Sequence, residues 1–316
     1  MSRHFPFPHL TASKKPKPAS AEISYDSTIT RIAISTKLPH SPAQPHSRLM
    51  KPLDPPRRGP TAILSFDFDG TLHDPAENPP VPHAFFEIIR KLREEQDVVW
   101  GINTGRSIPQ MLEGFLESRF PFLPDWVIAR EREIHFPNAF GRWVPESNWN
   151  KKCEKDIHKL FKKSRKLLAH IRAEVQEHTG AQWIEMEGEP AGIISRTEEE
   201  MEWIVAHITP IIATEPHFSW QRNSIYLRFG HREYQKGTSL SHVAAHYGVP
   251  TDRRFAIGDS HNDLEMLDPA HAGMAACPAN AVEAIRQKTR SVGGLITRAS
   301  HGQGAVEALN HYFFTA

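Results

Sequence analysis

Short apolar runs alternate with amphipathic stretches from residue 61 onward, and this alternation predicts the first elements of the fold. Residues 61–70 and 97–106 are apolar on both faces, which is typical of buried parallel strands. Residues 82–96 and 107–118 instead repeat apolar positions at helical spacing. This β-α-β-α order predicts an α/β fold, with a doubly wound parallel sheet and right-handed crossovers.

The pattern changes after this unit and indicates an inserted module of α+β type. Residues 125–133 are predicted to form a strand, and residues 134–147 a short β segment. Residues 151–180 have the pattern of one long amphipathic helix that ends at a glycine. A later helix begins with a capping-box pattern, Thr197 followed three residues on by Glu200.

These patterns divide the chain into three predicted parts. We expect an α/β core from residues 59–107 and 231–316, and an inserted α+β cap from residues 108–230. Residues 1–58 hold many of the 26 prolines and few acidic residues, so we expect most of this segment to be disordered. A basic transit peptide and a true start at Met50 are alternative interpretations of the same segment.

Composition narrows the class of protein further. The chain has 316 residues, is 39% hydrophobic and 24% charged, and carries a formal net charge of +1. These values fit a soluble globular protein and give no overall basic footprint for nucleic acid. The two cysteines lie far apart in the sequence and favour a reducing, cytoplasmic location. The chain has no apolar run of about 18 residues, so no membrane span is predicted. We expect a monomer or weak homo-oligomer.

Polar side chains follow several of the predicted core strands. Asp67 and Asp69 end the first strand, Thr104 follows the second, and Asp259 and Asp263 follow a later apolar run, "RFAIG". Because ligands of open α/β sheets bind at the carboxyl ends of the strands, we expect these groups to converge on one crevice. Carboxylates gathered there would repel one another, and hard oxygen ligands of this kind suit Mg²⁺. The sequence therefore predicts a magnesium site that also receives a phosphate.

The spacing suggests a division of labour between the two neighbouring aspartates. Asp67 ends a buried strand, so a rigid carboxylate could attack phosphorus and form an aspartyl-phosphate. Asp69 could protonate the leaving oxygen and later activate water. Gly70 permits a turn that brings backbone N–H groups toward phosphoryl oxygens. Thr104 and Lys236 could offset the developing negative charge.

Four short motifs carry a resemblance to a known family. "DFDGT", "NTGR", the lysine of "YQKG" and "GDSHND" appear in this order and resemble the four motifs of the haloacid dehalogenase superfamily. The large insert between the second and third motifs is similar to the type IIB cap of Cof-like and sucrose-phosphatase-like phosphatases. The resemblance covers residues 61–316.

This resemblance implies a function and a role for each motif residue. It implies a Mg²⁺-dependent phosphatase that hydrolyses a small phosphomonoester, with a sugar phosphate favoured, through an aspartyl-phosphate. A phosphomutase and a non-catalytic phosphate-ligand sensor are the alternatives. The implied catalytic residues are Asp67 as nucleophile, Asp69 as general acid/base and Lys236 as the neutralising charge. The implied phosphate-binding residues are Thr104, Gly105, Arg106 and Asn262. The implied metal-binding residues are Asp67, Asp69 through its backbone carbonyl, Asp259, and Asp263 in support of the metal's water shell or of Lys236.

One departure from the family pattern concerns the substrate. Many cap strands of the family end in an Asn-Gly-Ala turn, whereas here "VIA" is followed by Arg130, Glu131, Arg132 and Glu133. The missing glycine turn leaves the nearby loop and the substrate undefined by the resemblance.

Overall fold

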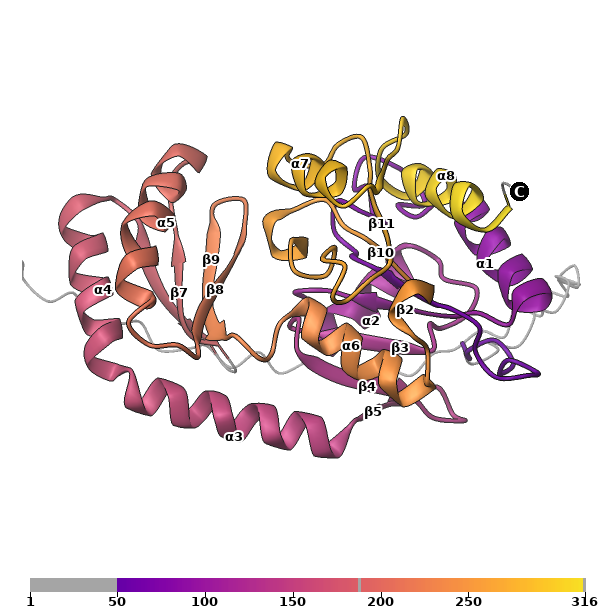
Figure 1. Ribbon diagram of the computed structural model, residues 1–316, viewed down its shortest axis with the longest axis horizontal. Coiled ribbons are helices and arrows are strands. Elements are labelled where there is room, and N and C mark those ends of the chain that lie inside the picture. The colour runs from indigo at the N-terminus through magenta and orange to yellow at the C-terminus, as the bar shows by residue number, and fades with distance from the viewer. Residues whose placement is uncertain (1–49, 187–188, 315–316) are drawn as a thin grey trace, which may run out of the picture. The chain divides into compact units, whose positions relative to one another are not determined.

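A computed structural model of the chain describes residues 50–186 and 189–314, and its larger sheet forms an α/β core (Figure 1). Within these residues the sheet has eight strands in the order β12-β11-β10-β1-β2-β3-β4-β5. The strands from β12 to β3 pair in parallel, and β4 and β5 add an antiparallel edge. Their bounds are β1 Ile63–Phe66, β2 Val99–Asn103, β3 Trp126–Ala129, β4 Glu133–Pro137, β5 Trp143–Pro145, β10 Arg254–Ile257, β11 Met274–Cys277 and β12 Leu295–Ile296. The predicted fold class is confirmed.

Helices cover both faces of this sheet, as a doubly wound fold requires. One face packs against α1 (His83–Gln96), α2 (Ile108–Glu117) and α8 (His301–Phe314), and the other against α6 (Lys236–Tyr247) and α7 (Glu283–Ser291). Leu64 and Phe66 of β1 are buried against the first group, and Ile63 against the second. Since successive strand residues point to opposite faces, an apolar run without alternation suits a strand buried on both sides. Two 3₁₀ turns, η1 (Thr251–Arg253) and η2 (His261–Asp263), flank β10.

The second sheet belongs to the inserted module, residues 147–231, which we call the cap. Its antiparallel order is β6-β7-β9-β8, with β6 Gln182–Met186, β7 Glu189–Ile194, β8 Phe218–Asn223 and β9 Tyr226–His231. The helices α4 (Arg165–His178) and α5 (Glu198–Ile212) pack on one face, where they bury Leu227 and Phe229 of β9. The alternate residues Tyr226 and Arg228 line a crevice on the core side.

The cap begins later in the chain than the sequence analysis predicts. Residues 108–145 contain α2, β3, β4 and β5, and these strands extend the core sheet beyond β2. The predicted boundary at residue 108 is therefore wrong. The change from a β-α-β to a β-β pattern marks an antiparallel edge of the same sheet. It does not mark a new module, because a hairpin strand needs no crossover helix.

The predicted long helix of the cap is two helices. The helix α3 (Ser147–Lys163) ends at Lys163, and α4 begins at Arg165, so that Ser164 alone separates them (Figure 1). Ser164 is buried and has φ −89° and ψ 13°, outside the helical range. The apolar spacing continues across the break, so periodicity alone does not reveal it.

Part of the predicted disordered extension packs against the core. Residues 1–49 lie outside the described residues, but residues 50–58 do not. Pro52 pairs with Leu123, and the buried side chain of Arg93 donates a hydrogen bond to the carbonyl oxygen of Asp54 at 2.5 Å. The prediction of disorder is therefore wrong for residues 50–58. Prolines suit an extended segment of this kind because it needs few backbone N–H donors.

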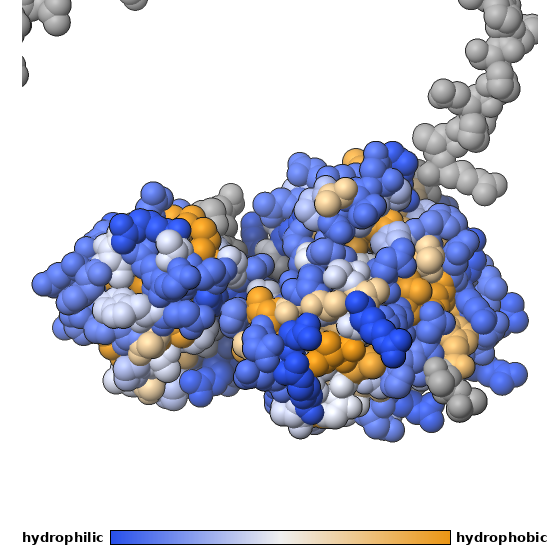
Figure 2. All heavy atoms as spheres, turned by 90° about the horizontal axis from the view of Figure 1, so that it is seen from above, coloured by the Kyte–Doolittle hydropathy of each residue, from blue (hydrophilic) through white to orange (hydrophobic). Residues whose placement is uncertain are grey.

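The face of the described residues that Figure 2 displays is mostly hydrophilic. Figure 2 shows small, separate hydrophobic patches on the face that it displays. Among the helices of residues 50–186 and 189–314, none combines the length and apolarity that crossing a bilayer needs.

Candidate active site

Asp67 occupies the carboxyl end of β1, directly after the buried run that the sequence predicts. Its backbone N–H bonds to the carbonyl oxygen of Ile257 in the neighbouring strand β10, at 3.0 Å. This bond extends the sheet pairing by one residue and fixes the direction of the carboxylate. Asp67 is only 5% exposed. Burial raises the pKa of this carboxyl well above its usual range. The charge of Lys236 opposes that change, and the charges of Asp263 and Asp259 add to it.

Lys236 holds two of the buried carboxylates together. It is the first residue of α6, and its ammonium lies 2.6 Å from Asp67 Oδ1 and 2.6 Å from Asp263 Oδ1. Burial alone would lower the pKa of Lys236, but the carboxylates of Asp263 and Asp67 raise it above its usual value. The other oxygen of Asp263 accepts the backbone N–H groups of Asp259 and Ser260 at 3.0 and 3.1 Å. Asp263 therefore orients both Lys236 and the loop after β10.

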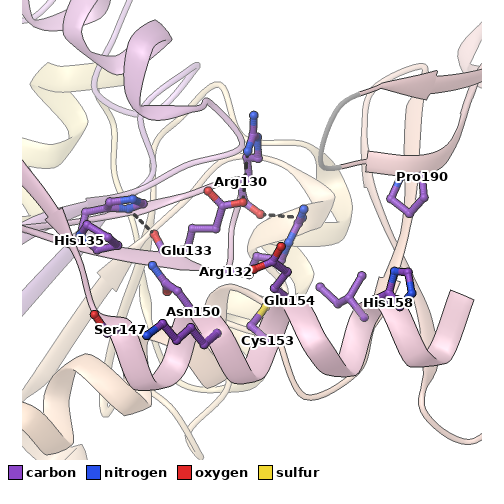
Figure 3. A pocket seen from close by; sticks show the side chains of 13 residues that line it. Arg130, Arg132, Glu133, His135, Ser147, Asn150, Cys153, Glu154, His158 and Pro190 are labelled. Carbon is purple, nitrogen blue, oxygen red and sulfur yellow. Dashed lines mark hydrogen bonds and ion pairs between the residues drawn. The ribbon is translucent and has the colours of Figure 1, made fainter.

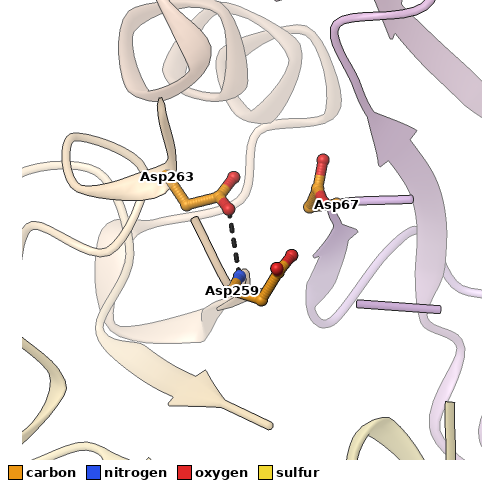
Figure 4. A group of neighbouring side chains, drawn as sticks. All are labelled: Asp67, Asp259 and Asp263. Atoms are coloured by element: carbon orange, nitrogen blue, oxygen red, sulfur yellow. Dashed lines mark hydrogen bonds between the residues drawn. The ribbon is translucent and has the colours of Figure 1, made fainter. Parts of the chain in front are cut away.

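Three aspartates are grouped closely enough to bind one cation. Ligand atoms of Asp67, Asp259 and Asp263 lie within 4.8 Å of one another (Figure 4). Burial and the neighbouring Asp263 raise the pKa of Asp259 to about 6. Gly70 is essential to this arrangement: its φ is +81°, and a Cβ there would lie 2.5 Å from Asp259 Oδ2. Buried carboxylates that repel one another in this way fit the oxygen-rich environment of Mg²⁺.

Asp69 lies apart from that group, and its carboxylate pairs with Arg106. The Nε and Nη2 atoms of Arg106 donate to the two carboxylate oxygens at 2.8 and 2.5 Å. The side chain of Asp69 is 44% exposed, at the rim of the crevice. Arg106 also lies 4.8 Å above the ring of Phe68. The arginine thus holds the carboxylate of Asp69 in place.

The loop after β2 brings Thr104 and Gly105 to the same crevice. Thr104 is 1% exposed, and its hydroxyl accepts the N–H of Arg106 at 3.1 Å. The preceding Asn103 donates to the carbonyl oxygen of Lys236 at 2.9 Å and so fixes the start of α6 against this loop. The lysine and the threonine are far apart in sequence and converge through this contact.

Glu131 is a site residue that the sequence analysis does not select. It lies in the turn between β3 and β4, is 2% exposed and has φ +63°. One carboxylate oxygen accepts the side-chain N–H of Asn262 at 2.7 Å, and the other forms an ion pair with Arg228 of the cap. The sequence signal for Glu131 is the departure from the family's glycine turn. A charged residue at positive φ in a buried turn is uncommon.

The crevice between core and cap has a volume of about 280 Å³. The lining residues are Asp67, Asp69, Thr104, Gly105, Arg106, Gln110, Glu131 and Asn262 of the core, with Asn223, Tyr226 and Arg228 of the cap. A larger cavity of about 650 Å³ lies beside α3 and is lined by Arg130, Arg132, Glu133 and Cys153 among others (Figure 3). We assign the chemistry to the smaller space, because Asp67 lines it and connects it to Lys236 and to the other grouped carboxylates.

The structure combines a doubly wound α/β core, which carries the grouped carboxylates, with an inserted cap. Residues 132–301 match the family model for haloacid dehalogenase-like hydrolases. This match covers more than half of the chain and includes Lys236, Asp259 and Asp263. The chain belongs to the haloacid dehalogenase-like hydrolase family, as its four motifs indicate.

Solved structures show the same fold. A sucrose-phosphatase from Synechocystis, solved with sucrose and phosphate, superposes with a TM-score of 0.62 at 14% identity, over 80% of this chain and 98% of that chain. A haloacid dehalogenase-like hydrolase from Bacillus subtilis gives 0.58 at 17% identity, over 85% and 97%. A subclass IIB sugar phosphatase gives 0.53 at 17% identity, over 81% of this chain and 100% of that chain. These structures agree with the predicted type IIB cap.

Curated relatives align over a shorter segment. A phosphoglycolate phosphatase from Methanoculleus marisnigri is 35% identical over 78 residues, which is 25% of this chain and 31% of the relative. A 5-amino-6-(5-phospho-D-ribitylamino)uracil phosphatase from Bacillus subtilis is 35% identical over 78 residues, 25% of this chain and 27% of the relative. The aligned segment thus spans less than a third of the length of these relatives.

Proposed function

We propose that the protein is a Mg²⁺-dependent phosphatase that hydrolyses a small phosphomonoester through an aspartyl-phosphate. The observation that carries this proposal is the buried Asp67 carboxylate, held 2.6 Å from Lys236 in a crevice that Asp69 and Thr104 also line. A carboxylate fixed in this way is suited to nucleophilic attack, and a second carboxylate at the rim is suited to proton transfer.

In the proposed reaction, a carboxylate oxygen of Asp67 attacks phosphorus while the bond from phosphorus to the leaving oxygen breaks. Asp69 gives its proton to that oxygen, so the alcohol departs neutral. Water then attacks the aspartyl-phosphate, Asp69 takes the water's proton, and inorganic phosphate leaves as the Asp67 carboxylate is restored. Arg106 holds Asp69 at the rim, and protonation of Asp69 requires this ion pair to loosen.

Other residues of the crevice would bind and stabilise the phosphoryl group. The hydroxyl of Thr104 accepts one hydrogen bond and keeps its own hydrogen for a phosphoryl oxygen. Lys236 supplies a fixed positive charge. Asp67, Asp259 and the backbone carbonyl of Asp69 would hold Mg²⁺, with Asp263 in support. The bound ion would offset the charge of these carboxylates and of the phosphate.

A phosphorylated sugar or a related small metabolite is the proposed substrate class. Asn223, Tyr226 and Gln110 provide amide and hydroxyl groups next to the phosphoryl site. Hydroxyl-rich leaving groups suit such neutral donors and acceptors. A cytoplasmic location, a monomeric or weakly oligomeric state and the absence of a nucleic-acid partner remain predictions. Both cysteines, Cys153 and Cys277, are buried free thiols.

The test is release of inorganic phosphate from a panel of sugar phosphates, with Mg²⁺ and with EDTA. We expect release that EDTA abolishes and that Asp67→Asn reduces by at least about a thousandfold, since the nucleophile is lost. Asp268→Asn is the matched control, because Asp268 pairs with Lys288 near the surface. Turnover that survives Asp67→Asn with a folded protein would overturn the mechanism. Transfer of phosphate within the substrate, without its release, would instead identify a mutase.

A further inference from the structure

We propose that Glu131 sets the charge preference for the leaving group of the substrate. By neutralising Arg228, it favours phosphomonoesters with an uncharged, hydroxyl-bearing leaving group over those that carry a carboxylate. This inference rests on the proposed phosphatase function and names the substrate class of the same site.

In the turn after β3, Glu131 faces the crevice, whereas the residues next to it face another cavity. Arg130, Arg132 and Glu133 line the larger cavity beside α3 (Figure 3), whereas Glu131 lines the crevice that contains Asp67. The backbone N–H of Glu131 bonds to the carbonyl oxygen of Thr104 at 2.8 Å. The backbone of Glu131 is thus fixed to the loop that would bind the phosphoryl group, and its side chain lines the crevice beside that loop.

The ion pair between Glu131 and Arg228 lies against that loop. A Cβ added to Gly105 would be 3.6 Å from Glu131 Oε1 and 4.0 Å from Arg228 Nη2. Both side chains of the pair are nearly buried, 3% and 6% exposed. A leaving group bonded to the phosphoryl group therefore meets this pair within a few bonds of the phosphorus.

The other charged side chains at the crevice also have partners of opposite sign. Arg106 pairs with Asp69, and Lys236 pairs with Asp67. Beside these pairs the lining offers the neutral Gln110, Asn223 and Tyr226. A carboxylate on the leaving group would face the buried charge of Glu131 and would have to compete with it for Arg228. Repulsion between like charges is strong in a desolvated site. A hydroxyl group is uncharged and therefore meets no such repulsion.

The experiment compares two substrates that differ in this group alone. One is 2-phosphoglycolate, and the other is 2-hydroxyethyl phosphate, in which CH₂OH replaces the carboxylate. We expect the unmodified protein to show a kcat/KM for 2-hydroxyethyl phosphate at least about tenfold above that for 2-phosphoglycolate. Glu131→Gln keeps an oxygen acceptor for Asn262 but removes the charge, so the ratio should fall by about tenfold or more.

Glu133→Gln is the matched control, because it alters a glutamate of the same turn that faces the other cavity. It should leave the ratio unchanged, and melting temperatures establish that both variants are folded. An unchanged ratio in an active Glu131→Gln protein would overturn this inference alone. So would an unmodified protein that prefers 2-phosphoglycolate. No phosphate release from any substrate by the unmodified protein would overturn the proposed function as well.

Discussion

Replacement of Lys236 by methionine should destabilise the protein strongly, because it leaves two buried carboxylates without their cation. The Lys236 side chain is 0% exposed, and those of Asp67 and Asp263 are 7% and 0% exposed. Loss of one partner from a buried ion pair costs about 3–5 kcal/mol. Methionine fills a similar volume, so the loss reports charge more than packing. We expect the free energy of unfolding to fall by about this amount at pH 7 without metal.

A second lysine provides a control with the same N–O distance to one carboxylate and different burial. Lys288 lies 2.6 Å from Asp268, but their side chains are 23% and 42% exposed. Lys288→Met should therefore cost less than about 1 kcal/mol. Urea unfolding followed by circular dichroism in EDTA measures both losses. Equal losses from the two variants would refute the argument that burial decides the energy of the pair.

The Lys236→Met variant should also depend on pH in a defined direction. Asp259 already has a pKa of about 6, raised by burial and by Asp263, and removal of the lysine charge favours protonation of the group further. A carboxyl with a raised pKa in the folded state binds more protons there than in the unfolded chain. Stability is then greatest at low pH and is lost as pH rises through the folded-state pKa. The deficit of the variant should shrink from pH 7 to pH 5.

Three further changes test other parts of the structure. Gly101→Ala should lower the free energy of unfolding by about 3 kcal/mol in urea titrations, because the added Cβ would lie 2.1 Å from the ring of the fully buried Trp126. Glu200→Gln should cost about 0.5 kcal/mol at pH 7, because its partner Arg196 is exposed. Hydrogen bonds from Arg196 lower the pKa of Glu200 to about 2, so this stabilisation is present above about pH 4.5 and disappears toward pH 2. Stability curves of both proteins over this range should converge at the acidic end. Mg²⁺ at 100 times its dissociation constant should stabilise the protein by about 2.7 kcal/mol, and Asp259→Asn should weaken this effect in thermal-shift titrations.

The sequence predicts the core of the site because the positions of its residues depend on where the strands end. Asp67, Thr104 and Asp259 each follow a strand of the parallel sheet, and parallel strands present their carboxyl ends at one edge. Pattern and motif order were therefore sufficient to bring them together. The structure also confirms the predicted helix start at Thr197, the N-cap of α5, whose hydroxyl accepts the N–H of Glu200 at 3.1 Å.

Contacts between long side chains are harder to predict from the sequence. The bonds from Arg106 to Asp69 join two loops, and their geometry depends on the conformation of both. The cap boundary was missed because β3 belongs to the parallel sheet although a hairpin follows it. The break at Ser164 was missed because serine is compatible with a helix, and the residue carries neither the glycine nor the proline signal of a helix end.

Strand periodicity predicts the direction of the Arg228 side chain but not its partner, Glu131. In β9, Leu227 and Phe229 must face the cap helices, so the alternation assigns Arg228 to the opposite face. That step needs only the sequence. The partner of Arg228 depends on how the turn after β3 is built, and this turn places a glutamate at positive φ where the family pattern has glycine. A glycine there could not neutralise the arginine. The preference for the leaving group is therefore set by the core turn and the cap strand together, through the ion pair of Glu131 and Arg228.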